Sequence, residues 1–289
     1  MLWTPGNDFN WSVDNFGTSF TNAGLGANSP GHANANTKGA NTNMLNGIAE
    51  DCYGIAILFS GQSATTVIRR CMVDLLIDPA AGVGNAGSAW TVAIANLYAN
   101  SPTFGTSGAF GCWYYFPLYL KAGTAIGTAH QNLVAGTLPL RVSIRIYGKP
   151  SRPELLKVGT KVETLGATIG TTTGVAVTPG TANKGSYSAT LGTLTRDSFW
   201  FQLGIGSADT SMTARGYLFD VAVNVTNKIL VMQDVFYTVT GTIEQASCGM
   251  FGAVAPCRFV AAGQDVYVRG VGDGGADSSM TAVVYAMAS

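Results

Sequence analysis

The feature that most constrains the fold is a block of alternating apolar and polar residues that occurs twice in the chain. The first copy covers residues 117–126 and closes with 140–148. At a shift of 140 residues, Ala122-Gly123 falls on Ala262-Gly263, and 140–148 falls on 280–288 without a gap. Alternation of this kind indicates strands, and its repetition indicates an internal duplication, which decides the architecture of the whole chain.

Residues upstream of this block repeat at a different shift, of 146 positions. The matched pairs are Lys38-Gly39 with Lys184-Gly185, Leu45 with Leu191, Asp51 with Asp197, Arg69 with Arg215, and Asp74 with Asp220. The shift changes because the second copy is shorter in the loop region between residues 78 and 117. We expect the repeated aspartates to make shared structural contacts, because a carboxylate at matching strand positions serves the fold more simply than it serves catalysis.

The number and spacing of strand signals predict an all-β protein. Each copy of about 125 residues has the size of one domain. About eight strand signals per copy, many glycine turns and no convincing amphipathic helix favour two tandem jelly-roll-like β-sandwich domains, related by internal duplication. The predicted parts are an extended N-terminal arm at 1–20, domain 1 at 21–148, a linker at 149–164 and domain 2 at 165–289.

The first fifty residues show no sustained helical or strand period, but they contain several isolated aromatic residues. Disordered segments are usually poor in aromatic residues, so an ordered arm is favoured over a mobile terminus. We expect Trp3, Phe9 and Trp11 to make arm contacts with the chain's own domain or with a neighbouring subunit.

Charge and hydropathy limit the classes of partner. Charged residues make up 11% of the chain against 47% apolar residues, which leaves few charges for the surface and favours a homo-oligomer. The 16 basic and 16 acidic residues cancel, so no basic footprint for nucleic acid is present. The N-terminus lacks the pattern of a signal peptide, and no apolar run is long enough for a membrane span, which predicts synthesis in the cytoplasm without membrane insertion.

Residues that could support catalysis or metal binding are few and scattered. His32 and His130 are the two histidines, and the second copy keeps neither. The segment Gly272 to Asp277 resembles a calcium loop but lacks its series of ligands, so a tight turn is expected. The cysteines have no metal-binding spacing and are predicted to be buried apolar residues: Cys52, Cys71, Cys112, Cys248 and Cys257. The sequence therefore predicts a non-enzymatic protein without a catalytic residue, metal or cofactor.

One aromatic cluster, Trp113, Tyr114 and Tyr115, has two interpretations. Flat amphipathic rings at a sheet edge can stack on the faces of sugars. Trp and Tyr are also enriched in cores and in contacts between subunits. The first interpretation predicts a carbohydrate-binding protein, and the second predicts a subunit contact.

The chain resembles a group of structural proteins of tailed bacteriophages. The resemblance lies in the turn at 30–39 with its repeat at 179–185, in the strand 117–126 and in the closing strand 140–148. It implies a virion protein of the head-decoration, head-fibre or tail-associated kind.

The chain departs from that group's pattern at two positions in each copy. Lys121 stands where those proteins have proline and Ala125 where they have arginine, and the second copy has Ala261 and Asp265 there. The resemblance implies a structural component of a virion, made in the host cytoplasm, that contacts capsid or tail subunits and takes part in host attachment. The alternative is a lectin-like protein that recognises a cell-surface glycan, and a glycan-cleaving enzyme is a third hypothesis.

Overall fold

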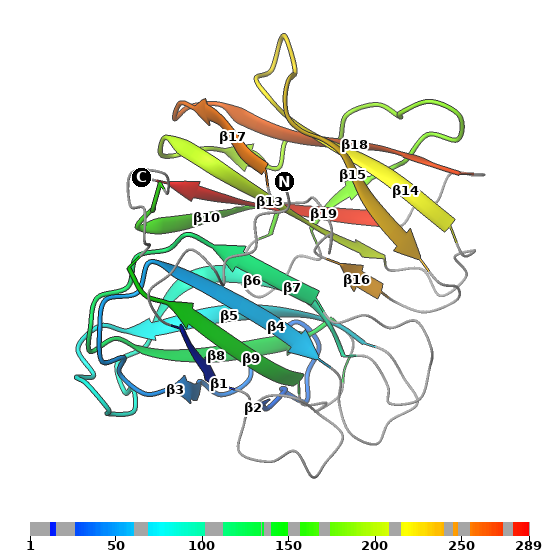
Figure 1. Ribbon diagram of the computed structural model, residues 1–289. Helices are drawn as coiled ribbons and strands as arrows, with labels where there is room; N and C mark the ends of the chain where they lie inside the picture. The colour runs from blue at the N-terminus through cyan, green and yellow to red at the C-terminus, as the bar shows by residue number, and fades with distance from the viewer. Residues whose placement is uncertain are drawn as a thin grey trace.

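The protein is all-β, as the sequence predicts, and its strands form antiparallel sheets (Figure 1). The computed structural model describes residues 12–15, 27–60, 69–101, 112–133, 135, 140–149, 157–167, 174–207, 215–239, 245–247, 255–273 and 280–288. Within these ranges every regular element is a strand.

The first half contains two sheets that enclose an apolar core, in a β-sandwich-like arrangement. One sheet has the order β1 (Ser12–Asn15), β9 (Leu140–Tyr147), β4 (Gly54–Ser60) and β7 (Cys112–Phe116), and β2 (Ala27–Ser29) also pairs with β9. The other has the order β3 (Thr42–Leu45), β8 (Ala125–Asn132), β5 (Arg69–Asp78) and β6 (Thr91–Ser101). Inward positions of β4 and β5, such as Ile55, Ile57, Val73 and Leu75, are fully buried, as alternation requires.

The second half repeats these pairings. Its first sheet has the order β10 (Lys161–Leu165), β19 (Met280–Ala288), β13 (Ser198–Ser207) and β16 (Gln245–Ser247), with β11 (Val175–Val177) on β19 and β17 (Ala255–Val260) on β13. Its second sheet has the order β12 (Gly192–Thr193), β18 (Asp265–Gly272), β14 (Arg215–Val223) and β15 (Ile229–Val239). Strand by strand, β9 corresponds to β19, β4 to β13, β5 to β14 and β6 to β15.

Irregular positions also correspond between the halves. The ladder of β5 on β6 shifts register at Asp74, and that of β14 on β15 shifts at Asp220. Opposite these bulges, Asn96 and Asp234 have φ of 55° and 54°, a left-handed conformation that Asn and Asp adopt more readily than other side chains. The same local geometry therefore occurs at the same place in both halves.

The two halves pack closely, and one apolar core crosses the boundary between them. The first core includes side chains of the second half: Val162, Phe199, Trp200, Val283, Tyr285 and Met287. In Figure 1 the second half lies above the first, and β6 and β7 lie beneath β10 and β13. Both faces of β19 are buried as a result, because one face covers its own core and the other meets the first half.

The structure places the C-terminal end of the predicted linker, 149–164, differently from the expectation. Strand β10 begins at Lys161 and pairs with β19, so the second half starts before residue 165. Gly159 bonds to the first half, donating its amide to the Pro117 carbonyl at 2.8 Å. The strand has only five residues, and Lys161 and Glu163 among them leave a weak pattern of apolar alternation.

The predicted arm, 1–20, is described in part. Residues 12–15 form β1, which pairs with residues 144–147 of β9. Trp3, Phe9 and Trp11 lie outside the described residues, so their predicted contacts remain predictions.

Candidate functional site

The contact between the halves is built around two buried tyrosines. The Tyr285 hydroxyl donates to the Asn96 carbonyl at 2.8 Å and accepts the Tyr98 amide at 2.9 Å. The Tyr98 hydroxyl lies 2.7 Å from Thr281 Oγ1. Each of these tyrosines is fully buried, and a buried hydroxyl that is bonded across a boundary fixes both sides of it.

The aromatic cluster 113–115 belongs mostly to this contact. Tyr114 is 0% exposed, donates its hydroxyl to the Tyr98 carbonyl at 2.7 Å, and meets Tyr285 edge-to-face at 5.4 Å between ring centroids. Tyr115 is 1% exposed and packs against Trp200 with centroids 5.9 Å apart. Neither tyrosine presents a ring face to a sugar, because β7 is covered on one side by its own core and on the other by the second half. Trp113, which is half-buried, stacks on Tyr115.

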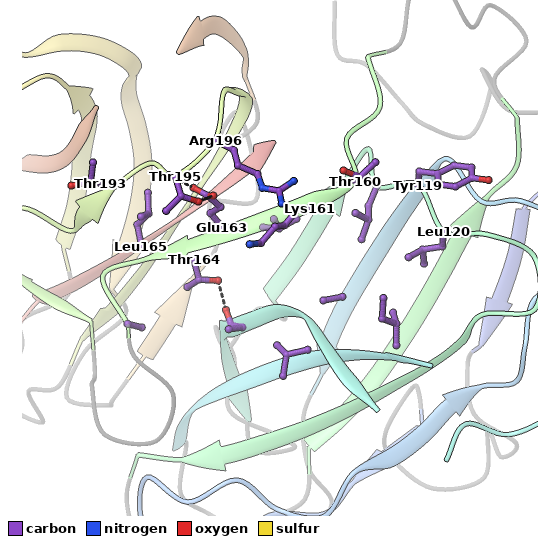
Figure 2. A pocket seen from close by; sticks show the side chains of 17 residues that line it. Tyr119, Leu120, Thr160, Lys161, Glu163, Thr164, Leu165, Thr193, Thr195 and Arg196 are labelled. Carbon is purple, nitrogen blue, oxygen red and sulfur yellow. Dashed lines mark hydrogen bonds between the residues drawn. The ribbon is translucent and has the colours of Figure 1, made fainter. Parts of the chain in front are cut away.

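A groove of about 580 Å³ runs along the boundary of the halves (Figure 2). Strand β10 forms one wall, and residues 92–95 and 118–120 of the first half lie across from it. A bond from Thr164 Oγ1 to the Ala95 carbonyl, 2.7 Å long, joins the two walls. The groove therefore exists because β10 pairs with the second half while it touches the first.

The buried acid of the groove is held by contacts within the protein. Glu163 is buried, and both of its oxygens accept bonds from Thr195, one from the backbone N–H at 2.9 Å and one from the hydroxyl. Lys161 and Arg196 are exposed at the rim. Among the described lining residues Glu163 is the one carboxylate, so the two-acid arrangement of a glycosidase is not assembled there.

The repeated aspartates Asp74 and Asp220 hold matching lysines. In the first half Lys38 Nζ lies 2.8 Å from Asp74 Oδ1 and 3.1 Å from Asn96 Oδ1. The same Asp74 oxygen accepts the Asn96 amide at 2.8 Å. This cluster ties the segment before β3 to β5 and β6, as expected for a structural aspartate.

In the second half Lys184 contacts two carboxylates, Asp220 and Asp234. Asp220 also accepts the Asp234 amide at 3.1 Å and Arg269 Nε at 3.0 Å. Burial acts to raise the pKa of Asp220, but the hydrogen bonds from Lys184, the Asp234 amide and Arg269 outweigh it and hold that pKa below its usual value.

The two lysines differ in pKa for a reason visible in their partners. Burial lowers the pKa of Lys38, and one carboxylate does not compensate. Burial acts in the same direction on Lys184, but hydrogen bonds to Asp220 and Asp234 outweigh it and raise the pKa of Lys184. The change from Asn96 to Asp234 supplies the second carboxylate.

The Asp51 and Asp197 pair also makes a shared contact. Asp51 accepts the Ala122 amide at 2.8 Å, and Asp197 accepts the Ala262 amide at 2.9 Å. The Ala122 N–H, helped by the Tyr119 hydroxyl, holds the pKa of Asp51 below its usual value. Each aspartate fixes the turn that precedes β8 or β18.

The remaining candidate residues are structural where they are described. Cys52 and Cys71 are buried and form no disulfide, as predicted, and burial raises the pKa of Cys52 to about 11. His130 is buried, with Nδ1 3.0 Å from Ser29 Oγ. Side chains of the other three cysteines, Cys112, Cys248 and Cys257, lie outside the described part, as does most of 272–277.

The described ranges contain neither a gathering of three metal-binding side chains nor a helix that could cross a bilayer. No three His, Cys, Asp or Glu residues come together there in a way that could hold a metal ion. No helix in those ranges is long and apolar enough to span a membrane.

Sequence reasoning missed an apolar surface on the second half. Phe236 of β15 is 55% exposed, and Leu230 of the same strand is 38% exposed. Leu218 of β14 pairs with Phe236 and is half-buried. The alternation of β15 shows that Phe236 points outward, but it does not show whether another surface covers it.

Comparison with known proteins gives no family. No protein-family model and no curated protein matches the sequence. The crystal structure of tripeptidyl peptidase 2 matches with a TM-score of 0.29 and 9% identity over 96% of this chain, which spans 23% of that chain. The CBM22-1-CBM22-2 tandem from Paenibacillus barcinonensis Xyn10C matches with a TM-score of 0.24 and 9% identity, covering 96% of this chain and 90% of that one. Neither likeness is close enough to carry an inference.

Proposed function

We propose that the protein is a non-enzymatic structural component of a bacteriophage virion that assembles through contacts between subunits. The observation that carries the proposal is the joining of two sandwich halves into one unit by a shared core, while Phe236 on the outer edge of the second half is 55% exposed. An aromatic side chain exposed at a sheet edge offers a contact to another subunit.

The strand order supports a finer description of the fold. The first half has one sheet of order β1-β9-β4-β7 and one of order β3-β8-β5-β6. The second half has the corresponding sheets β10-β19-β13-β16 and β12-β18-β14-β15. This order supports a jelly roll with two Greek keys, a fold that occurs in viral capsid and lectin domains. Matching pairings, bulges and lysine–aspartate clusters support an origin of the two halves by internal duplication.

The contacts of the repeated aspartates also support a structural role for the protein. Asp51, Asp74, Asp197 and Asp220 each hold a backbone amide, and Asp74 and Asp220 in addition hold a lysine. Their carboxylates therefore serve the fold. The proposed partners are other copies of the chain and capsid or tail subunits, and the proposed location is the virion.

Analysis of phage particles tests the proposal. Nuclease-treated particles from the host culture are separated on a density gradient, and the fractions are analysed by mass spectrometry and by labelling with an antibody to this chain. We expect the chain to sediment with packaged DNA at a fixed copy ratio to the major capsid subunit. A chain found only in particle-free fractions would sink the proposal.

Carbohydrate binding is the second candidate, and it now depends on Trp113. Its ring is half-buried and lies nearly parallel to Tyr115, at 14°, which is a supported platform of the kind that sugars stack on. A glycan array with the natural chain and with Trp113→Ala decides it. Binding that Trp113→Ala abolishes would support a lectin, and no binding, or binding unchanged by the substitution, would exclude this site.

A further inference from the structure

Strand β6 is the docking edge of the first half. Asn96 and Tyr98 of this strand bond to Tyr285 on the outer face of β19, and the Tyr98 hydroxyl meets Thr281 of the same strand. Tyr98 is 0% exposed. One sandwich half therefore binds another by setting this edge on the outer face of the partner's central strand.

Strand β15 is the corresponding edge of the second half, and no other strand among the described residues covers it in this way. In the first half Met72 pairs with Tyr98 and both are 0% exposed. In the second half Leu218 pairs with Phe236, which is 55% exposed. The surface that the first half buries against its neighbour is thus apolar and open in the second half.

The outer face of β19, on which β6 docks, also has a counterpart: the outer face of β9 in the first half. Alignment of β9 with β19 places Arg145 at the position of Tyr285 and Arg141 at the position of Thr281. Arg145 is exposed, and Arg141 is half-buried. This face carries guanidinium groups where the covered face carries hydroxyl groups.

The open edge keeps an acceptor for this face. The Asn96 carbonyl, which accepts the Tyr285 hydroxyl, corresponds to the Asp234 carbonyl, which would face the Arg145 guanidinium. A guanidinium that donates to an oxygen acceptor forms a charge-assisted hydrogen bond.

The second contact pair also has a complementary counterpart. Tyr98, which bonds to Thr281, corresponds to Phe236, which would face Arg141. An aromatic ring opposite a guanidinium gives a cation–π contact. Both pairs of the internal contact are therefore replaced by complementary pairs.

We infer that β15 of one copy docks on the outer face of β9 of a second copy, in the way that β6 docks on β19 within the chain. The contact joins different surfaces of the two copies, so repetition produces a closed ring or an open filament. The inference rests on the proposed function for its biological setting, since it names the surface through which the subunit would assemble.

Two variants that each disable one surface provide the test. Phe236→Asp disables the β15 edge, and the double variant Arg141→Glu/Arg145→Glu disables the β9 face. Sedimentation velocity should show an oligomer for the natural chain. Each variant alone should be monomeric, with self-association at least about 30-fold weaker, as for loss of an interface hot spot. An equimolar mixture should form a one-to-one heterodimer, because it contains one intact β15 edge and one intact β9 face.

A matched control separates this contact from general stickiness. Val83 is 60% exposed on the turn after β5, and Val83→Asp should assemble like the natural chain. Circular dichroism and thermal unfolding establish that every variant is folded. A monomeric natural chain, a variant that still self-associates, or a mixture that stays monomeric would each overturn the inference.

This test and the particle analysis can fail separately. If the chain is found in particles but the mixture does not pair, the β15 contact is wrong and the virion role stands. If the mixture pairs but the chain is absent from particles, the contact stands and the virion role is wrong.

Discussion

The two halves of the molecule have the same strand pairings but differ in what covers their second sheets. Tyr98 on β6 is fully buried by the neighbouring half, whereas Phe236, at the same place on β15, is 55% exposed. Beside these positions the first half has the neutral Asn96 and the second half has the charged Asp234, both in the left-handed conformation. The comparison teaches that the strand pairings fix the shape of the surface, while a few side chains at matching positions decide which surface it meets.

The two lysine clusters also combine the same backbone geometry with different side chains. The side chains of Lys38 and Lys184 are exposed to nearly the same extent, 16% and 18%. Their pKa values nevertheless shift in opposite directions. Burial prevails over the Asp74 carboxylate at Lys38, whereas hydrogen bonds to Asp220 and Asp234 prevail over burial at Lys184.

The largest expected effect compares Tyr98→Ala with Phe236→Ala. Tyr98→Ala opens a cavity in the shared core and should lower the free energy of unfolding by about 3–5 kcal/mol. Phe236→Ala changes an exposed side chain and should stay within about 0.5 kcal/mol. Urea denaturation at a concentration where the chain is monomeric measures both, and equal losses would show that the two positions are not covered differently.

An intermediate effect is expected from Asp220→Asn, which removes the charge that Lys184 and Arg269 contact. The loss at pH 7 should be about 1.5–3 kcal/mol, as for hydrogen bonds to charged groups. Because the pKa of Asp220 is held below 3.8, its contribution is complete above that pH and is lost as the pH falls through the folded-state pKa. Denaturation at pH 7 and pH 3 should show the difference from the natural chain shrinking with acid. A difference that is independent of pH would contradict the assignment.

The smallest effect is expected from Asp234→Asn, which makes the second cluster resemble the first. Asparagine keeps the left-handed backbone, so the change acts on charge alone, and about 0.5 kcal/mol should be lost at pH 7. The raised pKa of Lys184 stabilises the fold below pH 10.5, and this stabilisation is lost as the pH rises through the folded-state value. NMR titration of the lysine ammonium groups should find Lys184 titrating earlier in the variant, and Lys38 unchanged. An unchanged Lys184 would show that Asp234 does not raise its pKa.

Alternation and repetition in the sequence were enough to predict the all-β class and the structural use of the repeated aspartates. Burial of Cys52 and Cys71 was predicted too, because a thiol without metal spacing behaves as a small apolar side chain. These features depend on contacts within a half, where the period of a strand says which face a residue occupies.

Features that depend on the contact between the halves were not predictable from the sequence. Alternation places Tyr114 and Tyr115 on opposite faces of β7, but it does not reveal that the second half covers the outer face. The residues of strand β10 were predicted to belong to a linker, and only the structure shows that they pair with β19 and that Thr195 satisfies the Glu163 carboxylate. The open β15 edge was missed for the same reason, since a single sequence does not say which outward faces have a neighbour.

The lysine–aspartate clusters correspond to a sequence pattern that can be recognised even when overall sequence identity is low. In both halves the lysine precedes its aspartate by 36 residues. The strand opposite each aspartate then requires a residue that accepts positive φ, which restricts that position to Asn, Asp or Gly. A distant relative that has drifted beyond alignment can therefore be recognised by this spacing, provided that it appears twice and is followed each time by one of these three residues.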